Sequence, residues 1–188
     1  LDNLLPRAFG YCSSLIDVEL CDVTSIGNSC FINDESLGCI IVPDSVKYIG
    51  DQAFSGCIAL NEIVISNCLE TIGASAFRDC RSLRQVSLGE HVGFLGDLAF
   101  GGCRVLENVH FDGSMPCFGA DVFHGVSDDF KVTYESEYRD SWSGYHLTEK
   151  EMIDDSNTDL IINILRLITV LVVFMGIVVY VRCRRSHR

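Results

Sequence analysis

Hydrophobic residues recur along most of the chain at a nearly constant spacing. Phenylalanines mark the register at Phe9, Phe31, Phe54, Phe77, Phe100 and Phe123. The first interval is 22 residues, one residue being lost near positions 20–23, and each later interval is 23. A fixed period of this length is typical of stacked supersecondary units. The pattern therefore predicts a repeat array with six visible turns.

Each phenylalanine is followed by a short run in which apolar and polar residues alternate. The runs are 16–20, 38–42, 61–65, 84–88, 107–111 and 130–134. Alternation of this kind predicts strands with one buried face. We expect two inward columns, one formed by Val18, Ile40, Ile63, Val86, Val109 and Val132, and one formed by Leu20, Val42, Ile65, Leu88, Phe111 and Tyr134.

Two further elements recur between the strands. A hydrophobic residue followed by glycine, as in Ile49-Gly50 and Ile72-Gly73, predicts a bend. The segment 51–57, "DQAFSGC", spaces its alanine, phenylalanine and cysteine so that one helical turn would bury all three. One such unit buries its apolar residues only against its neighbours, so the array needs caps at both ends.

The stretch "VPDSVKYIGDQAFSGCIAL" at 42–60 resembles the BspA-like, Treponema-type leucine-rich repeat. The resemblance covers about residues 1–147 and implies a leucine-rich-repeat solenoid, an α/β repeat with a short strand and a short helical turn every 23 residues. Some repeats depart from the pattern: Asp34 replaces the repeat cysteine, Cys30 the alanine, and Val122 and Val126 stand for alanine and cysteine in the last unit.

The pattern divides the chain into five parts. Residues 1–126 form the repeats, and 127–147 form a C-terminal cap in which aromatic residues cover the end of the stack. The alternative for these aromatic residues is a binding patch; we favour a cap because terminal repeats require one. Residues 148–159 form an acidic stalk, 160–181 a transmembrane helix and 182–188 a basic tail.

The predicted membrane span, "LIINILRLITVLVVFMGIVVYV", has 22 residues. As a helix it is about 33 Å long, enough to cross a hydrocarbon core of about 30 Å. Four arginines follow it, which favours a cytoplasmic C-terminus and an extracellular or lumenal repeat array. The chain begins without methionine or a leader, so we expect a processed or partial sequence whose repeat number is a lower bound.

Two polar residues interrupt this span on one helical face. Arg166 either extends to the outer headgroups or, with Asn163, contacts another protein's membrane helix. We favour the first interpretation because the interruption lies near one end of the span. Cys183 beside the membrane is a candidate for acylation, and an unmodified thiol is equally compatible with its position.

The charge of the chain excludes one class of partner. Nine of the 14 basic residues and all 26 acidic residues lie before position 160, which gives that part a net charge of −17 and excludes nucleic acid as a partner.

The cysteines fall into two groups. Of the ten cysteines, four form one column, Cys12, Cys57, Cys80 and Cys103, and are expected to be buried and unpaired. The spacing does not decide whether Cys21, Cys39, Cys68 and Cys117 pair.

No catalytic or cofactor motif is present in the sequence, so we predict no enzyme, no cofactor and no metal site. The histidines are scattered over different units, and no paired Cys-x-x-Cys spacing for zinc occurs.

The outward residues of the strands form the candidate ligand-binding face. These residues are Asp17, Glu19, Cys39, Ile41, Glu62, Val64, Gln85, Ser87, Asn108 and His110. The alternative is that they only keep a half-exposed sheet soluble. We favour binding, because curved repeat arrays present such faces to partners.

The family resemblance implies a single-pass cell-surface protein that binds an extracellular protein ligand and mediates adhesion to host cells, matrix or other microbes. Two alternatives remain: a receptor or co-receptor subunit that acts through a membrane-helix partner, and a passive surface coat protein.

Overall fold

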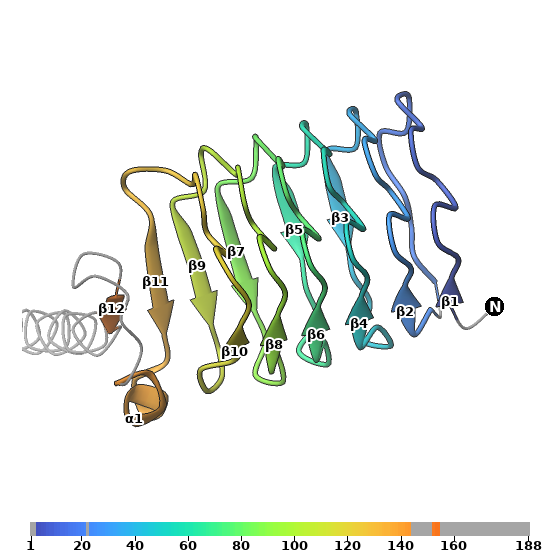
Figure 1. Ribbon diagram of the computed structural model, residues 1–188. Coiled ribbons are helices and arrows are strands. Elements are labelled where there is room, and N and C mark those ends of the chain that lie inside the picture. The colour runs from blue at the N-terminus through green and yellow to red at the C-terminus, as the bar shows by residue number, and fades with distance from the viewer. Residues whose placement is uncertain (1–2, 22, 144–151, 155–188) are drawn as a thin grey trace, which may run out of the picture. The chain divides into compact units, whose positions relative to one another are not determined.

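Each repeat forms one turn of a solenoid, and every turn after the first carries two short strands, as the ribbon in Figure 1 shows. The computed structural model describes residues 3–21, 23–143 and 152–154. The chain divides into two compact units, 1–153 and 154–188. The array of about six turns confirms the solenoid that the 23-residue period predicts.

The first strand of each turn lies where the alternating runs predict it. These strands are β3 (Cys39–Ile41), β5 (Glu62–Val64), β7 (Gln85–Leu88), β9 (Asn108–Phe111) and β11 (Lys131–Tyr134). All of their pairings are parallel. The expected strand at 16–20 is reduced to one bridge between Glu19 and Ile41.

The second strand of each turn builds a separate six-stranded parallel sheet. Its members are β1 (Asn3–Leu4), β2 (Ser25–Ile26), β4 (Tyr48–Ile49), β6 (Thr71–Ile72), β8 (Phe94–Leu95) and β10 (Cys117–Phe118). Every pair is in register at the repeat spacing, as Ile49 opposite Ile72 illustrates. We refer to it below as the short-strand sheet.

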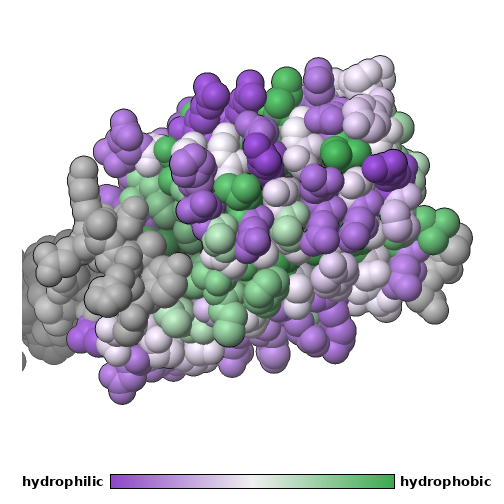
Figure 2. Space-filling view, viewed as in Figure 1, coloured by the Kyte–Doolittle hydropathy of each residue, from purple (hydrophilic) through white to green (hydrophobic). Residues whose placement is uncertain are grey.

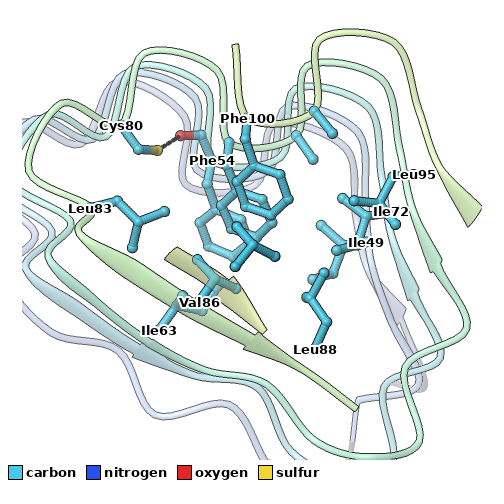
Figure 3. Packing of buried hydrophobic residues seen from close by; sticks show 14 of the residues in the cluster. Ile49, Phe54, Ile63, Ile72, Cys80, Leu83, Val86, Leu88, Leu95 and Phe100 are labelled. Carbon is cyan, nitrogen blue, oxygen red and sulfur yellow. Dashed lines mark hydrogen bonds between the residues drawn. The ribbon is translucent and has the colours of Figure 1, made fainter. Parts of the chain in front are cut away.

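A continuous column of aromatic rings fills the space between the short-strand sheet and the strands β3, β5, β7, β9 and β11 (Figure 3). The rings of successive phenylalanines are stacked, and from Phe9 to Phe100 their centroids lie 5.1–5.2 Å apart. Phe31, Phe54, Phe77 and Phe100 are fully buried. Stacked aromatic pairs contribute about 0.5–1.5 kcal/mol beyond the burial of their area. The inward strand residues, such as Ile63 and Val86, close the core from the strand side.

The glycines that follow each hydrophobic residue do not make the predicted bend. Ile49 and Ile72 end strands of the short-strand sheet, and the glycine after each lies against the backbone of the preceding turn. A Cβ on Gly73 would lie 2.6 Å from the Asp51 nitrogen. The glycine is therefore required by the close approach of stacked turns.

The predicted helical turn is also wrong. Residues 51–56 form turns because Gln52 and Gly56 have φ of 56° and 77°, in the left-handed region. Alternate N–H groups bond within the segment, and those between them donate to the next turn: Gln52 to Ala74, Phe54 to Ala76 and Gly56 to Arg78. Half of the N–H groups thus donate to the neighbouring repeat. A helix does not allow this, because its N–H groups donate to carbonyls of the same helix.

The cysteine column confirms the expected burial at Cys57, Cys80 and Cys103. Each thiol donates a hydrogen bond to a phenylalanine carbonyl of the preceding turn, at 3.1–3.2 Å. Cys12 is exposed, contrary to the prediction, because it packs against only one neighbouring turn within the described residues. All nine cysteines in the described parts of the chain are free thiols.

Aromatic side chains pack at the end of the array after the last repeat. A 3-10 turn at Ser136–Tyr138 leads into α1 (Arg139–Trp142). Trp142 is fully buried, stacks on Tyr134 and contacts Phe111. β12 (Met152–Asp154) follows β11 in the strand order. Tyr145 lies outside the described residues.

Within residues 3–21, 23–143 and 152–154, no helix has the length and apolar character that a membrane crossing requires. The predicted span at 160–181, the tail at 182–188 and most of the stalk at 148–159 lie outside the described residues.

Candidate binding face

Strand register arranges the predicted face residues in two outward columns. In β3 and β5, Cys39 is aligned with Glu62 and Ile41 with Val64. In β7, β9 and β11, one column runs through Gln85, Asn108 and Lys131, and the other through Ser87, His110 and Thr133. Asp17 and Glu19 precede them in the first turn, with Glu19 bridged to Ile41. Because side chains alternate along a strand, these residues point away from the phenylalanine column.

The first half of this strand face combines exposed apolar side chains with carboxylates. Ile41 and Val64 are directly paired and are 61% and 47% exposed. Burial and the neighbouring carboxylates of Glu62 and Asp17 raise the pKa of Cys39. A paired apolar spot surrounded by negative charge suits a ligand with an apolar side chain next to a basic one.

A shallow hollow of roughly 500 Å³ opens on the strand face between β5 and β9. Six predicted face residues line it: Glu62, Val64, Gln85, Ser87, Asn108 and His110. Asp17, Glu19 and Ile41 lie outside it. The structure thus brings most of the candidate residues to one concave place.

The hollow coincides with an interruption of the strand ladder. β3 pairs with β5, and β7 pairs with β9 and β9 with β11, whereas within residues 23–143 β5 and β7 belong to separate sheets. The strands of this face therefore do not form one continuous sheet within those residues. The hollow spans this interruption, since residues of β5 and of β7 and β9 line it.

The other end of the face carries a polar network. His110 Nδ1 is 2.8 Å from the hydroxyl oxygen of Thr133. The Thr133 hydroxyl donates a hydrogen bond to Asn108 Oδ1 at 3.2 Å. His110 Nε2 faces the carboxylates of Asp112 and Glu135. This network holds the His110 ring in one orientation beside the hollow.

Sequence reasoning missed several residues of the same face. Lys131 and Thr133 continue the two columns by one turn, and Asp112 and Glu135 approach His110. The repeat period contained the signal, because His110 and Thr133, like Asp112 and Glu135, are 23 residues apart. The candidate membrane-helix residues Asn163 and Arg166 lie outside the described residues.

Figure 2 shows hydrophilic side chains over much of the visible surface, with apolar residues between them in groups of different size. Such a mixed surface, together with a shallow hollow, is typical of a protein-binding face rather than of a deep small-molecule pocket.

Comparisons with known proteins agree with this architecture. Six copies of the BspA type leucine rich repeat region match residues 3–128. No curated protein sequence matches the chain.

Three solved structures share the fold. The T. pallidum leucine-rich repeat protein TpLRR is 24% identical over 64% of this chain, with a TM-score of 0.54. The pneumococcal vaccine antigen PcpA is 20% identical over 71%, with a TM-score of 0.56, and a leucine-rich repeat protein from Bacteroides ovatus is 24% identical over 71%, with a TM-score of 0.50. The matches cover 55%, 39% and 36% of those chains, so this chain spans about half or less of their lengths.

Proposed function

Because the chain belongs to the BspA-type leucine-rich repeat family, we propose that it is a protein-binding surface protein whose strand face contacts the partner. One observation carries the proposal: the hollow gathers Glu62, Val64, Gln85, Ser87, Asn108 and His110 on one face of the array. Solenoids commonly bind partners through such extended faces.

The chemistry of the face favours a protein ligand. Val64 next to the hollow offers an apolar contact, and Gln85, Ser87 and Asn108 offer hydrogen-bonding groups. The net charge of −17 before position 160 disfavours nucleic acid and favours a partner with a basic surface. Binding rather than catalysis, with no cofactor, is the function that we propose.

The proposed role is adhesion to host cells, matrix proteins or other microbes, which the family resemblance suggests. We place the repeats outside the cell and the C-terminus in the cytoplasm. This topology rests on the 22 apolar residues at 160–181 and on the arginines that follow them. It is tested by protease treatment of intact cells that express the full chain with a C-terminal tag. Loss of the repeats with retention of a protected tag supports it, and a fully protected chain contradicts it.

Adhesion is tested with a soluble fragment of residues 1–159, which contains the whole compact unit of residues 1–153. The fragment is titrated onto immobilised matrix proteins, host cells and microbial cells. We expect saturable binding to one of these surfaces, with competition by unlabelled fragment. Binding that never saturates on any surface would remove adhesion and leave a passive coat protein.

A further inference from the structure

Three potential metal ligands converge where β9 and β11 end. His110 lies in β9, Asp112 directly follows β9, and Glu135 directly follows β11. Phe111 pairs with Tyr134, so the residues after them, Asp112 and Glu135, occupy equivalent places in successive turns. One ligand atom from each of the three side chains lies within 4.8 Å of the others. The stacking of repeats therefore assembles the group.

The distances suit a small cation bound between these atoms. His110 Nε2 is 3.2 Å from Asp112 Oδ1 and 3.6 Å from Glu135 Oε1. Two ligands of a tetrahedral Zn²⁺ ion with bonds of about 2.0–2.1 Å lie about 3.3 Å apart. Both distances are within a few tenths of an ångström of that separation. The two carboxylates are 40% and 49% exposed, so small side-chain rotations are open to them.

Hydrogen bonds behind the imidazole orient it for this role. The Thr133 hydroxyl has one proton and donates it to Asn108 Oδ1, so its oxygen accepts from His110 Nδ1–H at 2.8 Å. In the neutral imidazole this tautomer leaves the Nε2 lone pair directed at the two carboxylates. Metal-binding histidines typically donate their other N–H to an oxygen in this way.

We propose that His110, Asp112 and Glu135 bind a divalent transition-metal ion, with Zn²⁺ as the best fit. An imidazole nitrogen favours Zn²⁺ over Ca²⁺ and Mg²⁺, which prefer all-oxygen sites. Three protein ligands leave a fourth position for water or for a ligand group. Asn108 and His110 also line the hollow, so the ion lies at its edge. The proposal does not depend on adhesion or on any protein partner.

The same arrangement of side chains would also suit a proton on His110 Nε2 in place of a metal ion. A doubly protonated imidazole would bridge both carboxylates as an ion pair. The two occupants are distinguished by titration with Zn²⁺ itself, because the ion pair needs no metal.

The test is isothermal titration of the purified full chain, without a histidine tag and in mild detergent, with ZnCl₂. Exposed thiols are first blocked with iodoacetamide, because Cys12, Cys21, Cys68 and Cys117 are exposed and thiolates bind Zn²⁺. We expect saturable binding that His110→Ala and Asp112→Asn abolish. Ca²⁺ and Mg²⁺ added in excess are expected not to displace the zinc.

Two matched variants complete the experiment. His124→Ala removes an exposed histidine elsewhere in the array and is expected to bind Zn²⁺ as the wild type does. Thr133→Val removes the hydroxyl that positions His110, and we expect its affinity to fall about 10–100-fold. Zn²⁺ is also expected to raise the Tm of the wild type and not that of His110→Ala. Equal Zn²⁺ binding by the wild type and His110→Ala, or no binding by either, overturns the proposal.

Discussion

The thiols of Cys57, Cys80 and Cys103 link successive turns of the solenoid. Cys57, Cys80 and Cys103 fill a narrow buried position and donate to a backbone carbonyl of the preceding turn. Burial raises the pKa of Cys57 and Cys103 to about 12 and that of Cys80 well above its ordinary value. The thiolate is the reactive form, so these thiols are inert in the folded protein.

We predict that alkylation separates two classes of cysteine in the 1–159 fragment. At pH 8, iodoacetamide should modify Cys21, Cys68 and Cys117, which are exposed, and leave Cys80 and Cys103 unmodified until the protein is unfolded. Mass spectrometry of tryptic peptides measures each rate. Modification of Cys80 as fast as Cys68 in the native fragment would contradict the buried column.

The raised pKa values also predict how stability depends on pH. Above about pH 9 the unfolded chain loses its thiol protons, because an ordinary cysteine has a pKa of about 8.5, whereas the folded chain keeps them at Cys57 and Cys103. The unfolded state then binds fewer protons, so the free energy of unfolding falls as the pH rises from 9 to 11. Each such thiol contributes a slope of up to about 1.4 kcal/mol per pH unit.

Urea unfolding at several pH values measures this slope. Cys57→Ala should make the alkaline decrease less steep, and Cys68→Ala, which removes an exposed thiol, should leave it unchanged. Identical slopes in the two variants would show that ionisation of the buried column does not contribute.

At the scale of the element, sequence periodicity was sufficient for the strands β3, β5, β7, β9 and β11, but not for the short-strand sheet, where it predicted bends, nor for the turns. The alternating runs predict β5 and β7 within one residue, because inward and outward positions differ in polarity along each strand. Ala53, Phe54 and Cys57 have a spacing that both a helical turn and the observed turns satisfy. Hydrogen bonds to the next repeat decide between them, and a single repeat read alone does not contain those partners.

The glycines test the close stacking of turns. A Cβ on Gly73 would lie 2.6 Å from Asp51 N and 2.7 Å from the Gly50 carbonyl carbon, which are backbone atoms of the preceding turn. We expect Gly73→Ala to reduce the free energy of unfolding by about 1–3 kcal/mol, the usual cost of overpacking.

Gly38→Ala is the matched control, because a Cβ there would have no atom within 4 Å. Its stability should stay within about 0.5 kcal/mol of the wild type. Urea denaturation of the 1–159 fragment measures both variants. Similar losses at the two positions would contradict an account in which turn-to-turn contact requires the glycine.

At the scale of the whole molecule, the sequence predicted the candidate face but not its shape. Pleat direction identified residues such as Gln85 and Ser87 as outward, and the structure places both beside one hollow. The hollow spans the place where β5 and β7 are not paired, which no local pattern indicates. The cluster of His110, Asp112 and Glu135 likewise requires knowing which turns are in contact.

The central claim is that the partner binds at the hollow on the strand face, and a pair of matched arginine substitutions tests it most directly. Ser87→Arg places a large charged side chain at the hollow, whereas Tyr48→Arg changes an exposed residue of the short-strand sheet. The dissociation constant of each 1–159 variant is measured on the surface that binds the wild-type fragment. We predict at least about tenfold weaker binding for Ser87→Arg, equivalent to about 1.4 kcal/mol, and wild-type binding for Tyr48→Arg. Unchanged binding by Ser87→Arg, with or without a loss in Tyr48→Arg, would contradict the claim.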